Sequence, residues 1–140
     1  MILHIVARGK IGRSPEAELV GRYIKRLAWP AKLTELPDHG GTLPPPAAPA
    51  RLVLLDERGP AMASEDFAAL LGRWRDEGVR ETRFLIGAAD GHGETSRAGA
   101  DLLLGFGAMT WPHLLVRAML AEQLYRATSI LAGHPYHRAG

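Results

Sequence analysis

The last residues of the chain hold its densest group of side chains that can do chemistry. His134, Pro135, Tyr136, His137 and Arg138 place two imidazoles, a phenol and a guanidinium within five residues. An imidazole can move a proton near neutral pH, a guanidinium binds phosphate oxygens, and an aromatic ring stacks on a nucleobase. A chain end is also where fraying is most common. Two interpretations are therefore open, a frayed end and a site that binds phosphate and stacks on a base.

Two glycine-rich segments are the next candidates, because bare backbone amides can hold an anion. Residues 87–93 read GAADGHG and connect an expected strand to an expected helix, where N–H groups can face a phosphate or a carboxylate. Their spacing matches neither a dinucleotide-binding fingerprint nor a P-loop, so a simple turn is the alternative. Residues 105–110 read GFGAMT, and glycines inside a strand usually mark close approach by a ligand or another backbone. We therefore expect a pocket beside this segment.

The histidines elsewhere do not form a recognisable metal motif. None of the six, at positions 4, 39, 92, 113, 134 and 137, is spaced like a zinc-binding helix motif, and the chain has no cysteine, so we predict no metal site. His113 follows Trp111 and Pro112 at the start of an expected helix, where it is either an ordinary cap or a functional group. No serine–histidine–aspartate or paired-carboxylate arrangement is evident.

Apolar runs that alternate with amphipathic segments predict the scaffold for these residues. Strands are expected over residues 2–7, 32–36, 51–55, 82–86 and 105–110. Helices are expected after an N-cap at Ser14, from a cap at Ser64 to Gly78, and over residues 95–104 and 114–131. This alternation predicts an α/β fold, with a mostly parallel sheet flanked by helices. Because such sheets bind ligands at the carboxyl ends of their strands, the loops after Leu55, Ile86 and Thr110 are the expected site.

Length and charge limit the remaining possibilities. The 140 residues, 46% of them hydrophobic, suit one domain over 1–140, within which the proline-rich residues 37–50 are a loop and not a boundary. No apolar run is long enough for a signal sequence or a membrane span, and the lack of cysteine fits a reducing compartment, so we expect a cytoplasmic protein. The net charge is only +2, yet the first 34 residues carry seven Lys and Arg against two Asp and Glu. This basic segment keeps a nucleic-acid partner open.

Four segments, in order, are similar to one known family: MILHIVARGK, RLVLLDERG, FLIGAADG and WPHLLVRAMLAEQLYRATSILAGHPYHR. The similarity covers nearly the whole chain and is most specific in the last segment. On these residues the chain resembles the ribosomal large-subunit pseudouridine methyltransferase H family, which are minimal SPOUT methyltransferases. The resemblance implies a homodimer with a C-terminal trefoil knot that uses S-adenosylmethionine to methylate N3 of a pseudouridine in 23S rRNA of the assembled ribosome. It implies neither a membrane nor a DNA partner.

The resemblance also implies a cofactor site at the three expected strand ends. Its residues would be Leu55, Gly87, Phe106, Gly107, Ala108, Met109, Thr110 and Trp111. Glycines there leave room for a folded cofactor, and the apolar side chains offer a surface to adenine. In such dimers the tail lies near the cofactor site of the partner. The chain departs from the family pattern in three places, with Ala88 at a usual glycine, the proline-rich residues 37–49 in place of a helix, and two extra residues after Arg138.

Methyl transfer to N3 requires that the base lose its proton, so a general base or a cation beside the developing negative charge would lower the barrier. The candidates are His113, His134 and His137 as base or relay, Arg138 as the partner of negative charge, and Tyr136 as a stacking surface. Two alternatives stay open. One is an enzyme of the same fold with another RNA target, and the other is a non-catalytic RNA- or ribosome-binding module that has lost the cofactor.

Overall fold

The computed structural model of the chain describes residues 1–87 and 99–138. Their five strands form one sheet in the order β2-β1-β4-β3-β5, and every pairing in it is parallel. This confirms the predicted α/β class with a mostly parallel sheet. The strands are β1 (Ile2–Arg8), β2 (Ala31–Leu36), β3 (Ala50–Leu55), β4 (Glu81–Ile86) and β5 (Leu102–Leu104).

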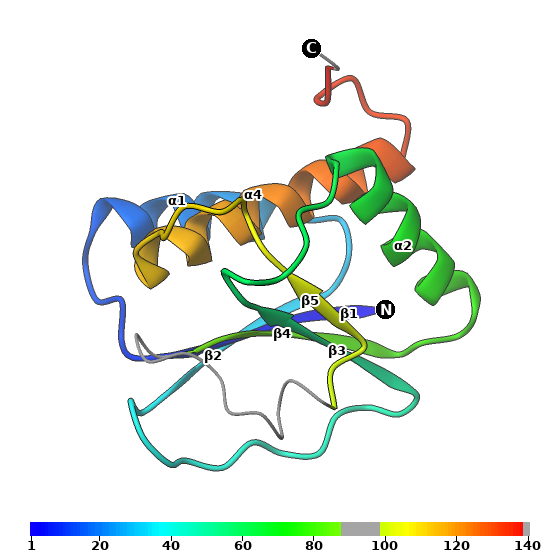
Figure 1. Cartoon of the computed structure of the whole chain (residues 1–140). Helices are drawn as coiled ribbons and strands as arrows, with labels where there is room; N and C mark the ends of the chain where they lie inside the picture. Colours follow the sequence, from blue (N-terminus) through cyan, green and yellow to red (C-terminus); the bar gives the residue numbers. More distant parts are fainter. Residues whose placement is uncertain (88–98, 139–140) are drawn as a thin grey trace.

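The helices of the described residues, α1 (Pro15–Arg26), α2 (Ser64–Asp76) and α4 (His113–Leu131), all cover the same face of the sheet (Figure 1). Helix α4 packs between α1 and α2. Helix α1 begins as its sequence predicts, because the Ser14 side chain accepts a hydrogen bond from the Ala17 amide and Pro15 occupies the first turn. Side chains from this face of the sheet and from α4 form one hydrophobic core, including Leu3, Ile5, Phe84, Leu120 and Leu124.

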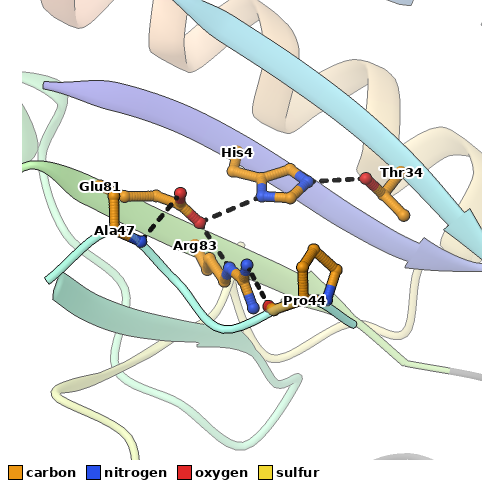
Figure 2. Close-up of polar contacts among 6 residues, drawn as sticks. All are labelled: His4, Thr34, Pro44, Ala47, Glu81 and Arg83. Atoms are coloured by element: carbon orange, nitrogen blue, oxygen red, sulfur yellow. Dashed lines mark hydrogen bonds and ion pairs between the residues drawn. The ribbon is translucent and has the colours of Figure 1, made fainter. Parts of the chain in front are cut away.

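The opposite face of the sheet is crossed by residues 37–49, which we call the proline strap and which contain no helix or strand (Figure 1). Two buried side chains of β4 hold it (Figure 2). Arg83 Nη2 donates to the Pro44 carbonyl at 2.7 Å, and Glu81 Oε1 accepts from the Ala47 amide at 3.4 Å. The strap therefore takes the place of a helix as the cover of this face.

The same buried cluster includes His4 from the neighbouring strand β1. Its Nδ1 lies 3.2 Å from Glu81 Oε2, and its Nε2 lies 2.7 Å from Thr34 Oγ1 on β2 (Figure 2). Burial raises the pKa of Glu81, but hydrogen bonds from Arg83, His4 and the Ala47 amide outweigh burial and hold that pKa below its usual value. Glu81 is therefore ionised at neutral pH, and His4 has the structural role expected of a strand histidine.

Three local predictions were wrong. Of the expected helix 95–104, residues 95–98 lie outside the described part, and Leu102–Leu104 form strand β5. The expected strand 105–110 is a loop that keeps a single bridge, between Gly105 and Ala61. Ser64 is the first residue of α2 and not its cap, because Ala63 occupies the N-cap and the Ser64 hydroxyl donates to Gln123 on α4 at 2.8 Å.

Candidate active site

A cleft of about 700 Å³ lies at the carboxyl edge of the sheet. Three strand ends and the first turn of α4 form its walls, which is the arrangement that parallel sheets use for small-molecule ligands. Its lining residues come from the end of β3 (Leu55, Asp56, Glu57, Arg58), the end of β4 (Ile86, Gly87), the segment after β5 (Leu104, Gly105, Phe106, Gly107, Met109, Thr110, Trp111, Pro112), and α4 (His113, Val116).

Seven of the eight residues expected to bind a cofactor line this cleft. The eighth, Ala108, lies in the same loop between two lining residues. The loop is closed on itself, because the Trp111 ring N–H donates to the Phe106 carbonyl at 3.2 Å. Met109 and Trp111 remain 75% and 40% exposed, so the mouth of the cleft presents apolar surface to whatever enters it.

The two glycines of this loop have different reasons to be glycine. A Cβ on Gly105 would lie 2.5 Å from the Gly59 carbonyl oxygen, so here another backbone makes the close approach. Gly107 has φ +102°, which other residues rarely adopt, and a Cβ there would meet no atom of residues 1–87 and 99–138 within 4 Å. Gly107 therefore leaves bare backbone facing open space on the wall of the cleft.

His113 is the predicted catalytic residue that the fold brings to the cleft. It is the first residue of α4, it is half-buried, and Pro112 occupies the N-cap position, so His113 is not the cap. The same end of α4 is fastened by Arg117, a fully buried guanidinium that donates to Glu35 and to the Gly9 carbonyl. Arg117 thereby fixes the turn that carries His113 and Val116 against the ends of β1 and β2.

Glu35 supports this anchor with its charge. Burial raises the pKa of Glu35, but hydrogen bonds from the Ile11 amide and from Arg117 outweigh it and hold the pKa below its usual value. The carboxylate is therefore ionised at neutral pH and balances the buried guanidinium. Sequence reasoning identified neither residue, because they are 82 positions apart along the chain.

The other predicted catalytic residues form a second cluster, which packs on α4 and α2. The Tyr136 hydroxyl donates to Glu122 at 3.2 Å, its ring lies edge-on to Tyr125 at 4.7 Å, and the Arg126 guanidinium sits 4.9 Å from its centre. His137 lies 2.9 Å from Arg126 and 2.7 Å from Glu65. These contacts, and that of the His134 amide with the Ser129 carbonyl, hold residues 134–137 in place, so this part of the tail is not a frayed end. We call this group the tail cluster.

Burial and neighbouring groups shift the pKa values of Tyr136, Glu65 and Arg126 in the tail cluster. Burial, the neighbouring Tyr23 and the Glu122 carboxylate raise the pKa of Tyr136 to about 12. The hydrogen bond from His137 lowers the pKa of Glu65, and the Glu122 carboxylate raises the pKa of Arg126. At neutral pH the Tyr136 hydroxyl is therefore protonated and donates a hydrogen bond to Glu122. His134 and Arg138 are exposed beside it.

Within one chain, the cleft and the tail cluster do not meet. His113 begins α4, whereas the tail folds back onto Glu122 and Arg126, which lie nine and thirteen residues further along the helix, roughly 14 and 20 Å from His113 along its axis. Glu122, Arg126 and Glu65, which hold the tail, were not identified from the sequence, because nothing local marks a helix residue that will pair with a tail 11 to 72 positions away in the chain.

Comparison with known proteins agrees with this architecture. The sequence pattern of the family described as "Predicted SPOUT methyltransferase" matches residues 42–137. The solved structure of the SpoU methyltransferase AviRb from Streptomyces viridochromogenes superposes with a TM-score of 0.51 at 15% identity, over 95% of this chain and 60% of that one, which supports the fold alone. The chain belongs to the SPOUT methyltransferase family, and it is therefore a methyltransferase whose family uses a donor of the S-adenosylmethionine type.

Several curated relatives match the chain over its full length at high identity. A protein from Novosphingobium aromaticivorans is 71% identical, and one from Erythrobacter litoralis is 70% identical, each over the full length of both chains. A third, from Zymomonas mobilis, is 61% identical over the full length of both. All three are named "Ribosomal RNA large subunit methyltransferase H". No helix of the described residues is long and apolar enough to span a membrane, and these residues contain no cluster of three metal-ligating side chains.

Proposed function

We propose that the chain methylates 23S rRNA of the assembled ribosome in the cytoplasm, at N3 of a pseudouridine, with S-adenosylmethionine as methyl donor. The observation that carries this proposal is the cleft at the carboxyl edge of the sheet, lined by the residues that the family resemblance implies for the cofactor. The names of the full-length relatives support an RNA of the large ribosomal subunit as substrate. The N3 position and the pseudouridine rest on the resemblance described above.

The cleft fits a nucleoside sulfonium by its chemistry. Leu55, Phe106 and Trp111 supply apolar surface for an adenine ring, and the bare backbone at Gly87 and Gly107 leaves room for polar contacts to the rest of the molecule. When bound, the cofactor supplies an electrophilic methyl group on sulfur. The cleft residues would hold it, and Met109 and Trp111, the exposed apolar residues of the lining, would lie beside it.

The chain must also help N3 to lose its proton. His113 is the half-buried histidine at the cleft, so we assign it the role of base or relay at that position. Arg138, and an imidazole of His134 or His137, would act on the developing negative charge or on a phosphate, and Tyr136 would stack on the base. Most of the rate enhancement would come from positioning the base against the methyl group.

Both sets of residues can serve one reaction if the chain acts as a homodimer. The described tail packs on Glu122 and Arg126 and does not line the cleft of its own chain, so a second copy would bring its tail to that cleft. Helix α4 carries half-buried apolar residues outside the hydrophobic core that are suited to such an interface, Leu114, Leu115 and Met119. A trefoil knot in the C-terminal part is included in this proposal on the strength of the family alone.

The decisive experiment is to add the purified protein and S-adenosylmethionine to ribosomes that lack the modification, and to map the methylated nucleotide by mass spectrometry. One new methyl on N3 of a pseudouridine in 23S rRNA is the expected result. A methyl elsewhere would assign the enzyme to another RNA target.

The His113→Gln variant should bind S-adenosylmethionine normally in calorimetry and transfer the methyl group at least tenfold more slowly.

The non-catalytic alternative is separated by the same calorimetry. An intact enzyme should bind S-adenosylmethionine in the micromolar range, about −8 kcal/mol. A module that has lost its cofactor would show no heat and no methyl incorporation. Ala88, the departure from the family pattern on which that alternative depends, lies outside the described residues.

A further inference from the structure

Helix α1 carries a row of cations on its solvent side. Arg22, Lys25 and Arg26 are exposed and follow Glu18 at helical spacings of four, seven and eight residues, which places them on one face. None of the three makes an ion pair or a hydrogen bond with another described residue. We call these three side chains, together with the hollow between them, the α1 cation surface.

Other cations of the helical layer are neutralised by neighbours, which makes this row distinct. On α2, Arg73 lies 3.7 Å from Glu77 and Arg75 lies 3.1 Å from Asp76. On α4, Arg117 is paired with Glu35 and Arg126 with Glu122. The α1 cation surface thus holds positive charge that the described part of the chain does not use for its own stability.

The hollow between the cations has bare backbone at its floor. Gly21 lies in the middle of α1, and the hollow is lined by Glu18, Gly21, Arg22, Lys25 and Arg26. A Cβ on Gly21 would meet nothing within 4 Å among the described atoms, so packing inside the chain does not require glycine there. A glycine inside a helix costs up to about 1 kcal/mol relative to alanine. It leaves the helix open to close approach by another molecule.

We propose that the α1 cation surface is a contact site for the phosphate backbone of ribosomal RNA, separate from the cleft and from the tail cluster. This inference rests on the proposed ribosomal substrate, a polyanion that is much larger than the protein. Two of the three cations are arginines, whose planar guanidinium matches phosphate oxygens in pairs. Phosphate contacts of this kind fix orientation without reading sequence, so the surface would orient the enzyme while the cleft selects the base.

A second copy of the chain fits this surface poorly. In a dimer with twofold symmetry the same patch meets itself, so an interface centred here would set three cations against three cations. The repulsion would disfavour association through α1. An RNA strand carries the opposite charge, and its backbone can lie along the hollow on this face of α1.

The test compares ribosome binding by two variants of equal charge. R22Q/R26Q removes two cations of the α1 cation surface, and R73Q/R80Q removes two exposed arginines elsewhere. Binding to purified ribosomes is measured by co-sedimentation at several salt concentrations. We expect R22Q/R26Q to weaken binding about tenfold at 100 mM salt and to reduce the salt slope of log K by roughly 1.5, because two phosphate contacts are lost. R73Q/R80Q should stay within twofold of the unmodified protein.

Methylation kinetics provide a second measure. R22Q/R26Q should raise KM for ribosomes while kcat, the calorimetric affinity for S-adenosylmethionine and the oligomeric state stay unchanged. Equal shifts in the two variants, or no shift in either, would overturn the inference. A loss of binding with an unchanged salt slope would assign the surface to a protein contact. A change in oligomeric state would assign it to a second copy of the chain. Either result would also overturn the inference that this surface binds RNA phosphates.

Failure of the proposed function is distinguishable from failure of this inference. If the unmodified protein binds ribosomes but transfers no methyl group, the proposed reaction is wrong and the binding comparison still decides the role of α1. If the unmodified protein does not bind ribosomes at all, the α1 assignment is overturned whatever RNA is methylated.

Discussion

Gly107 is the residue whose conformation and position most directly define the cleft. Its φ of +102° is unfavourable for any side chain, and its missing Cβ faces open space. We expect Gly107→Val to abolish detectable S-adenosylmethionine binding in calorimetry, because a branched side chain would fill the wall of the cleft. The backbone strain should lower the free energy of unfolding by about 1–3 kcal/mol without preventing folding.

Gly105→Ala is the matched control for that prediction. Its Cβ would collide with the Gly59 carbonyl, so this variant should lose stability through packing of the loop after β3. If Gly107→Val folds and binds the cofactor with unchanged affinity, Gly107 does not contact it and the assignment of the cleft wall is wrong.

Tyr136 allows a test of the tail that depends on pH. Its pKa is raised to about 12, so its hydroxyl is protonated throughout the range in which ribosomes are stable. We expect the pH–rate profile of Tyr136→Phe to have the same shape as that of the unmodified enzyme between pH 6 and 9. The ring that would stack is retained, and the hydrogen bonds of its hydroxyl with Glu122 and Tyr23 are lost, which costs about 1 kcal/mol of stability for each. A basic limb that disappears in Tyr136→Phe would instead identify this phenol as a titrating catalytic group.

At the scale of elements, β4 and the proline strap form one unit held by charge. Glu81 is ionised in the folded chain because its pKa lies below the usual 4.5. Its stabilising contribution is therefore fully present above pH 4.5 and is lost as the pH falls through the lower folded-state pKa. We expect Glu81→Gln to reduce the free energy of unfolding by about 3 kcal/mol at pH 7, since Arg83 and His4 lose a buried partner.

Urea unfolding at pH 7 and at successively lower pH checks this. The difference between Glu81→Gln and the unmodified chain should be constant down to pH 4.5 and should narrow at more acidic pH. The exposed Glu77→Gln, which breaks only surface pairs with Arg73 and Arg51, should change stability by less than about 1 kcal/mol. A difference for Glu81→Gln that does not depend on pH would show that its charge is not what holds the strap.

The elements that were predicted best from the sequence are those whose hydrophobic pattern extends over many residues. Strands β1, β3 and β4 and helices α1, α2 and α4 lie within two or three residues of their expected positions, because buried runs and amphipathic faces are local signals. Strand β5 was misassigned because Leu102–Leu104 is only three residues long and carries no period. Its glycine-rich continuation looked like a strand and is a loop, in which Gly105 approaches Gly59 closely and Gly107 has a positive φ.

The candidate site was predictable to the extent that strand ends are predictable. Parallel strands must end at one edge, so Leu55, Gly87 and the loop after β5 converge as expected. The partners of the tail were not predictable, because Glu122 and Glu65 become its neighbours only when α4 packs beside α2. The same holds for Arg117, whose side chain reaches the ends of two strands that the sequence cannot orient relative to α4.

At the scale of the whole molecule, its small positive charge limits which substrate it can use. The net charge of +2 means that acidic residues offset most of the positive charge, so even with the α1 cation surface the chain provides little of the phosphate neutralisation that binding to free RNA requires. We therefore expect labelled methyl from S-adenosylmethionine to enter intact ribosomes and almost none to enter protein-free 23S rRNA. The two substrates are compared side by side at equal concentration. Equal labelling of the protein-free RNA would show that assembly is not required.

The cleft and the tail cluster are separate within one chain. We therefore predict that each active site of a dimer combines the cleft of one chain with the tail of the other. Deletion of residues 134–140 should abolish methyl transfer while sparing S-adenosylmethionine binding, because none of the described tail residues lines the cleft. Gly107→Val should also be inactive, because its cleft is blocked although its tail is intact.

If the tail acts on the partner's cleft, unfolding and refolding the two inactive proteins together should restore activity, because each mixed dimer combines one intact cleft with one intact tail. Random pairing predicts about a quarter of the unmodified activity. Refolding each protein separately before mixing is the control, and no recovery after refolding together would mean that the tail serves its own chain or has no part in the reaction.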